Sequence, residues 1–111
     1  MVLVYSANLA LAAELKDFVG IWKWQGFKVE VKECKQTGVC AKVIAGPKNI
    51  GMKVFASEMS LKDGDFYGRI AHPQSGEVYN TRMRLLNSDR WQLNGCTKKG
   101  LCMGGSFDRV K

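Results

Sequence analysis

Short runs of alternating residues between frequent turn signals are the feature that most constrains how this chain can fold. From residue 17 onward, clusters built on Gly, Pro, Asn or Asp recur at positions 24–26, 36–38, 46–49, 62–65, 73–76, 87–89 and 98–100. Between these clusters, apolar and polar residues alternate, as in FKVEVK at 27–32. A period of two with one apolar face indicates β-strands packed around a core.

The same pattern predicts the fold class. After Leu15, no stretch keeps apolar residues at helical spacing for three turns without an interrupting Gly or Pro, so helix is confined to the N-terminus. We predict one all-β domain at residues 14–111, a small antiparallel up-and-down β-barrel of about eight strands, because closure removes exposed sheet edges. Its predicted core consists of Phe18, Trp22, Phe27, Val29, Val31, Val43, Val54 or Phe55, Ile70, Tyr79, Met83, Leu85, Trp91, Leu93 and Phe107.

Four cysteines form two matched loops, CKQTGVC and CTKKGLC. Five residues separate the members of each pair, which is longer than a typical zinc knuckle and suits a hairpin whose flanking residues face each other across two strands. We therefore predict disulfides between Cys34 and Cys40 and between Cys96 and Cys102. A four-cysteine zinc site, cross-pairing and unpaired thiols are the alternatives, while redox catalysis is disfavoured because the sequence has no Cys-x-x-Cys.

The N-terminal segment resembles part of an export signal. Residues 1–13, MVLVYSANLALAA, carry no charge and end near Ala-Leu-Ala, a small-x-small pattern that a signal peptidase could cut. A native N-terminal element packed on the domain is the alternative. Together with the predicted disulfides, this segment predicts a periplasmic or secreted protein. The sequence has no apolar run long enough to predict a transmembrane span.

The charge balance favours anionic partners. The chain has 17 Lys and Arg against 10 Asp and Glu, for a net charge of +7. The basic residues are spread along the sequence with acids among them, and no dense basic block alternates with aromatic residues. We therefore predict no nucleic-acid site.

Two segments resemble the strands that meet at one end of a lipocalin barrel. Gly20-Ile-Trp22 is similar to the G-x-W that opens the first strand of lipocalins and their calycin relatives, and Arg109 lies in the expected last strand. The resemblance implies a lipocalin-like barrel in which Trp22 closes one end. It also implies that Arg109 packs over the Trp22 ring and bonds to nearby backbone, a cation–π contact that ties the first strand to the last.

A longer segment carries a more specific family resemblance. GRIAHPQSGEVY, at 68–79, resembles the G-x-I-x-D-P-x-x-G-x-x-Y segment of a lipocalin-like family of exported bacterial proteins known as a domain of unknown function. The first cysteine loop and the closing strands at 93–109 resemble the same family, so the likeness covers about residues 17–111. This chain departs from the family in having His72 in place of Asp, a short middle segment at 46–52 and a second cysteine pair.

No arrangement of residues indicates catalysis. His72 is the only histidine, and its place before Pro73 predicts a turn residue with local hydrogen bonds. Asp63 and Asp65 belong to KDGD, a typical hairpin turn, and no helix follows Gly104-Gly105 to make a phosphate loop. We predict that the protein is not an enzyme and holds no cofactor or metal.

Large and adaptable apolar residues remain as candidates for a ligand cavity, although each also suits an ordinary core. These candidates are Trp24, Phe55, Met59, Tyr79, Met83 and Trp91. The sequence predicts an exported barrel that binds a small apolar or amphipathic ligand without catalysis. The alternative is a protein-interaction or inhibitor module of the cell envelope that presents stapled loops.

Overall fold

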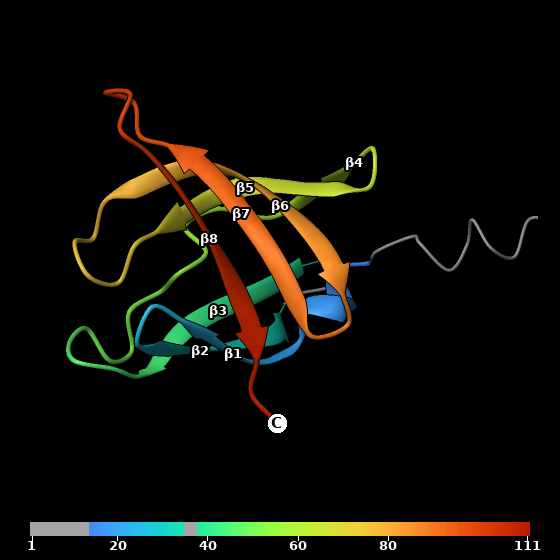
Figure 1. Cartoon of the computed structure of the whole chain (residues 1–111), viewed down its shortest axis with the longest axis horizontal. Coiled ribbons are helices and arrows are strands. Elements are labelled where there is room, and N and C mark those ends of the chain that lie inside the picture. Colours follow the sequence, from blue (N-terminus) through green and yellow to red (C-terminus); the bar gives the residue numbers. More distant parts are fainter. Residues whose placement is uncertain (1–13, 35–37) are drawn as a thin grey trace, which may run out of the picture.

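The computed structural model describes residues 14–34 and 38–111, and its strands form one antiparallel sheet curled into a half-barrel (Figure 1). A short 3-10 helix and eight strands follow along the chain: η1 (Leu15–Phe18), β1 (Gly20–Trp24), β2 (Phe27–Cys34), β3 (Gly38–Ala45), β4 (Ser60–Lys62), β5 (Asp65–Ala71), β6 (Val78–Asn87), β7 (Arg90–Cys96) and β8 (Cys102–Arg109). Their order across the sheet is β3-β2-β1-β8-β7-β6-β5-β4. The prediction of eight up-and-down strands with almost no helix is confirmed.

Residues 51–56, which connect β3 to β4, form hydrogen bonds on both sides. The Val54 amide donates to the Ala41 carbonyl of β3 (2.8 Å), and the Ala71 amide of β5 donates to the Val54 carbonyl (2.8 Å). Two isolated bridges lie in the same segment. The segment therefore covers part of the open side of the half-barrel and satisfies backbone groups that the sheet edges would expose.

Stacked aromatic rings fill the interior and form what we call the ring column. Phe107 lies between Trp24 and Trp91, with ring centroids 4.6 Å and 3.8 Å away. Trp91 and Phe18 form a T-shaped pair with ring centroids 4.8 Å apart, and Phe18 and Phe66 form another at 4.6 Å. All five side chains are buried, and such pairs add stability beyond the apolar area that they remove from water. Their contacts run from one end of the barrel toward the other.

The end of the barrel next to η1, here called the sealed end, is closed by Trp22 and Arg109. The Arg109 guanidinium lies 4.3 Å from the centre of the Trp22 ring. It donates to the carbonyls of Asp17 (3.1 Å), Val19 (3.0 Å) and Ser88 (3.0 Å). The arrangement is the one that the lipocalin resemblance implies, and it joins residues 17–19, the β6–β7 turn and the last strand.

Gly20 belongs to the same closure. Its φ is +143°, and a Cβ at this position would collide with the Arg109 guanidinium. The Trp22 indole N–H also donates to the Phe18 carbonyl at 2.7 Å. The glycine is therefore required both by its backbone conformation and by the close approach of the arginine.

The opposite end, here called the loop end, carries the connections at 25–26, 46–51, 72–77 and 97–101 (Figure 1). His72 links two of them, because its Nδ1 accepts from the Gln74 amide (3.0 Å) and its Nε2 lies 3.2 Å from the Gln25 side-chain oxygen. Its ring lies 4.8 Å from that of Trp24. Burial lowers the pKa of His72, against a smaller opposing effect of Glu77. His72 thus forms the local hydrogen bonds that its place in the sequence predicts.

The remaining predictions fall into three groups. The structure pairs Cys34 with Cys40 and Cys96 with Cys102, as predicted, with Cα atoms 5.8 Å and 3.9 Å apart. Every residue predicted for the core is buried except Leu85, which is partly buried. The predicted export segment at 1–13 and part of the turn predicted at 36–38 lie outside the described residues. Within the described residues, no helix is long and apolar enough to cross a membrane.

Candidate interaction site

The six residues predicted to bind a ligand all face the interior. Their side chains are between 0 % and 8 % exposed. Trp24 and Trp91 belong to the ring column, and Met83 and Met59 pack in the same core. Phe55 also lines a cavity of about 240 Å³ in the barrel wall, beside the Cys34–Cys40 disulfide. The structure therefore brings these candidates together mainly as mutual packing partners.

Two indole groups in the interior lack hydrogen bonds. The Nε1 atoms of Trp24 and Trp91 are buried and have no partner among the described residues. Gly105 lies close to the first of them, since a Cβ there would be 3.4 Å from Trp24 Nε1. Buried N–H groups in folded proteins are nearly always paired, so these two mark places where a polar atom could be held.

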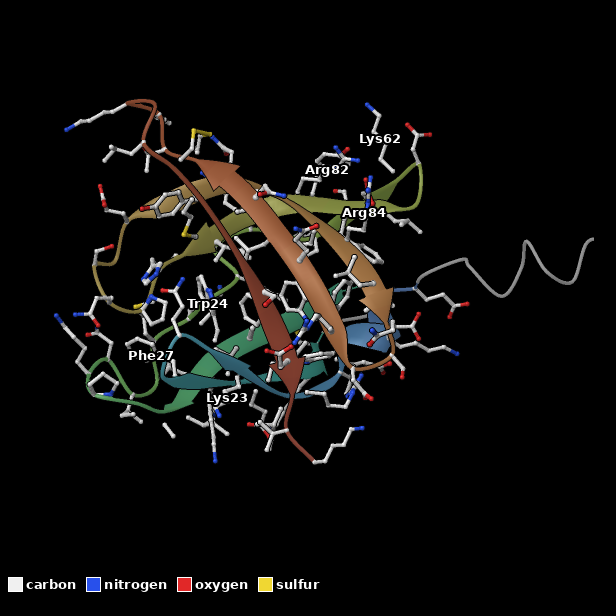
Figure 2. All side chains as sticks on the ribbon, in the orientation of Figure 1. Lys23, Trp24, Phe27, Lys62, Arg82 and Arg84 are labelled. Atoms are coloured by element: carbon white, nitrogen blue, oxygen red, sulfur yellow. A yellow bond between two sulfur atoms is a disulfide. The ribbon has the colours of Figure 1, made fainter. Side chains whose placement is uncertain are left out.

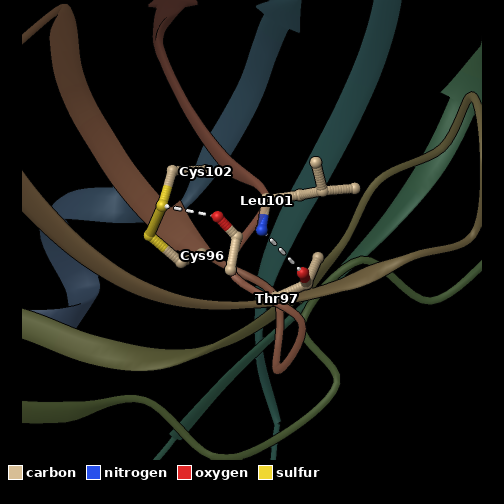
Figure 3. The surroundings of a disulfide bond; sticks show 5 residues. Cys96, Thr97, Leu101 and Cys102 are labelled. Carbon is tan, nitrogen blue, oxygen red and sulfur yellow. Dashed lines mark hydrogen bonds between the residues drawn. A yellow bond between two sulfur atoms is a disulfide. The ribbon is translucent and has the colours of Figure 1, made fainter.

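The stapled hairpin at 96–102 holds its own conformation (Figure 3). Cys96 and Cys102 are directly opposite each other on β7 and β8. Inside the loop, the Thr97 amide donates to the Leu101 carbonyl (2.8 Å), the Leu101 amide donates to the Thr97 hydroxyl (3.2 Å), and the Gly100 amide donates to the Thr97 carbonyl (3.0 Å). Gly100 has a φ of +92°, which favours glycine. A disulfide and three internal hydrogen bonds therefore fix the loop before any partner binds.

This hairpin projects from the loop end of the barrel (Figure 1) and presents both charge and apolar surface. Lys98 and Lys99 are exposed, and Leu101 is 57 % exposed. A groove of about 380 Å³ lies beside the hairpin. It is lined by Arg69, Glu77, Val78, Asn80, Thr97, Lys98 and Lys99. Exposed apolar side chains lie next to two lysines that form no ion pair among the described residues, which makes this the first candidate surface for recognition.

A second surface lies on the outward face of β4, β5 and β6. Figure 2 shows Lys62, Arg82 and Arg84 together over these strands. The pairing register places Tyr67 directly opposite Arg82, and Arg69 follows two residues later on the same face of β5. These basic residues are scattered along the sequence. The period-two alternation of β5 and β6 nevertheless places them on one face of the sheet.

Asp65 is the one carboxylate among these cations. Its Oδ2 accepts from Arg82 Nε (2.7 Å) and lies 2.6 Å from the terminal nitrogen, while its Oδ1 accepts from Arg84 Nε (3.2 Å). The hydrogen bond from Arg84, assisted by the one from Arg82, lowers the pKa of Asp65, although burial acts in the opposite direction. The carboxylate is therefore ionised at neutral pH and shared between two guanidinium groups.

The described residues contain no group of three or more His, Cys, Asp or Glu side chains that could hold a metal ion. His72 is the only histidine of the chain, and its ring nitrogens lie against Gln25 and the Gln74 amide. The stapled hairpin with its groove and the basic face of β4–β6 are the two candidate surfaces of this barrel.

Comparison with known proteins supports the fold. No protein-family model and no curated protein matches the sequence. One solved structure, described as a redesigned beta barrel, is similar with a TM-score of 0.64 and 13 % sequence identity, and the match covers 90 % of this chain and 97 % of that one. At this level of identity the similarity shows a β-barrel fold alone.

Proposed function

We propose that this protein is an exported, non-catalytic interaction module of the cell envelope that binds a partner protein through the stapled hairpin at 96–102 and its adjoining groove. The observation that carries the proposal is the preorganised loop. Because Cys96–Cys102 and the Thr97 hydrogen bonds already fix its backbone, binding through it loses little conformational entropy. Leu101 and Val78, 57 % and 42 % exposed, supply apolar anchors beside the lysines.

The filled interior favours a function at the surface over one inside the barrel. The rings of Trp24, Phe107 and Trp91 stack on one another along the space that a ligand would occupy. Two disulfides are typical of proteins that fold in an oxidising environment, which supports a periplasmic or secreted location. The resemblance to lipocalins and to the exported bacterial family agrees with this proposal and stays a prediction.

Site-specific photo-crosslinking in the envelope tests the proposal. A crosslinker in place of Lys99 should give one stoichiometric adduct, whereas a crosslinker in place of Asp63, at the exposed β4–β5 turn of the sealed end, should not. With the partner purified, Leu101→Ala should weaken binding at least about tenfold, as expected for an apolar anchor. Equal labelling from both positions, or an unchanged affinity of the Leu101 variant, would contradict the proposal.

Binding of a small apolar or amphipathic molecule is the second candidate, because the unpaired indoles of Trp24 and Trp91 could each donate to a polar group inside the barrel. The test is saturable uptake of a fluorescent fatty acid by delipidated protein. Uptake that falls in Trp24→Phe, with an unchanged melting temperature, would support this function. Absence of saturable uptake would exclude small-molecule binding as the function.

A further inference from the structure

The outward face of β4–β6 carries more positively than negatively charged side chains. Lys62, Arg69, Arg82 and Arg84 are all exposed on it. Asp65 alone among the residues of this face offers a carboxylate, and it is 6 % exposed under the two guanidinium groups. Lys62 and Arg69 make no ion pair among the described residues. The face therefore presents a net positive field to solvent.

Asp65 also positions two of these cations. It holds Arg82 by two contacts on one oxygen and Arg84 by contacts to both oxygens. Each guanidinium has five N–H donors, so donors remain on both for a second anion. Arginines fixed in this way lose less side-chain freedom on binding than mobile ones, and their planar forks suit carboxylate and sulfate groups.

Neutral amides border the arginines on the same face. The register places Asn80 opposite Arg69, Asn94 opposite Arg82, and Gln92 opposite Arg84. Side-chain amides both donate and accept hydrogen bonds, which suits a ligand rich in hydroxyl groups. Tyr67, 38 % exposed, adds one ring beside Arg82.

From these observations we propose that the outward face of β4–β6 is a docking surface for an acidic polysaccharide. The arginines bind its carboxylate or sulfate groups, the amides bind its hydroxyl groups, and the Tyr67 ring packs against a sugar. A nucleic acid fits less well, because single-strand binding relies on several stacking rings and this face offers one. The inference goes beyond the proposed protein interaction. It shares Arg69 and Asn80 with the groove beside the hairpin, but it depends mainly on Lys62, Arg82 and Arg84, which lie outside that groove.

Two matched double variants test the inference. The first, Lys62→Gln with Arg84→Gln, removes two charges from the face while Arg82 still pairs with Asp65. The second, Lys23→Gln with Lys28→Gln, removes two exposed charges from the outward face of β1 and β2. Both variants leave Leu101 and the groove residues Arg69, Lys98 and Lys99 unchanged, so failure of this inference is distinguishable from failure of the proposed function.

The probes are polygalacturonate, dextran sulfate, neutral dextran and a single-stranded oligodeoxynucleotide, with affinity measured at about 0.15 M salt. We expect saturable binding of at least one acidic polysaccharide and none of neutral dextran. The first variant should lose about tenfold or more in affinity and the second less than about threefold, because surface charges act mainly on ligands that contact them. Thermal unfolding checks that both variants remain folded.

The outcomes separate the alternatives. Binding of only the carboxylated or only the sulfated polymer supports the inference and identifies the acidic group. Equal losses in the two variants would show that net charge alone drives binding and would overturn it. Tighter binding of the oligonucleotide, or no saturable binding of either acidic polymer by the unaltered protein, would overturn it as well.

Discussion

The sealed end and the loop end of this barrel are held together in different ways. At the sealed end, Arg109 bonds to three backbone carbonyls, two next to η1 and one in the β6–β7 turn, and packs on Trp22. Each end has one disulfide, but at the loop end the connections are otherwise held by contacts between neighbouring turns, such as those of His72. The difference predicts that the sealed end contributes more to stability, and it leaves the loop-end connections accessible for the recognition that we propose.

The largest expected effect comes from Arg109→Ala at the sealed end. The substitution removes the cation–π contact and leaves three carbonyls without their charged donor, so we expect the free energy of unfolding to fall by about 3 kcal/mol. Urea unfolding measures the change. The matched control is Arg90→Ala, whose ion pair with Asp108 is exposed and should contribute less than about 1 kcal/mol. Similar losses in the two variants would show that Arg109 contributes no more than an exposed ion pair nearby, and would contradict its stabilising role at the sealed end.

Removal of the loop-end disulfide should have a smaller effect on stability and a larger one on binding. Cys96→Ala with Cys102→Ala opens a loop with a sequence separation of 6, for which we expect a loss of about 2 kcal/mol. Because the loop would no longer be preorganised, affinity for the partner protein should also fall. Comparison with Cys34→Ala and Cys40→Ala, which opens a loop of equal length at the sealed end, provides the control. A loss of partner binding in that control as well would show that general loosening, and not the hairpin, is responsible.

The smallest effect should come from the protonation of His72. Its pKa is below the ordinary value of 6.5 in the folded protein, so the unfolded chain takes up this proton first as the pH falls. Stability should therefore decline as the pH drops below about 6.5 and level off once the folded protein is protonated too. Urea midpoints between about pH 7 and pH 5 measure this change, and His72→Gln should remove it. A dependence that persists in the variant would assign it to another group.

Much of the fold follows from local patterns in the sequence. Alternation defines the strands because each side chain on a strand points to the opposite face from its neighbours. The spacing of Cys96 and Cys102 predicts their pairing, since directly opposed residues of a hairpin are close enough for a disulfide. These are short-range relationships, and a single sequence contains them.

The binding surfaces depend on relationships that no local pattern contains. Tyr67 lies opposite Arg82 because of the register between β5 and β6, which the connection at 72–77 sets. The attachment of Arg82 and Arg84 to Asp65 follows from the same register. The irregular segment at 51–56 has no alternation that would predict its bonds to both β3 and β5.

The meeting of the first and last strands has a consequence for how the chain folds. Arg109 is separated by 92 residues from Asp17, whose carbonyl it binds. Contacts of such high sequence separation carry a large loop-closure entropy and slow the search for the native state. The sealed end therefore cannot form until the last strand has been synthesised, and a nascent chain stays unfolded for longer than one stabilised by local contacts. A delay of this kind agrees with the proposed export, in which an extended chain crosses a membrane before its cysteines are oxidised.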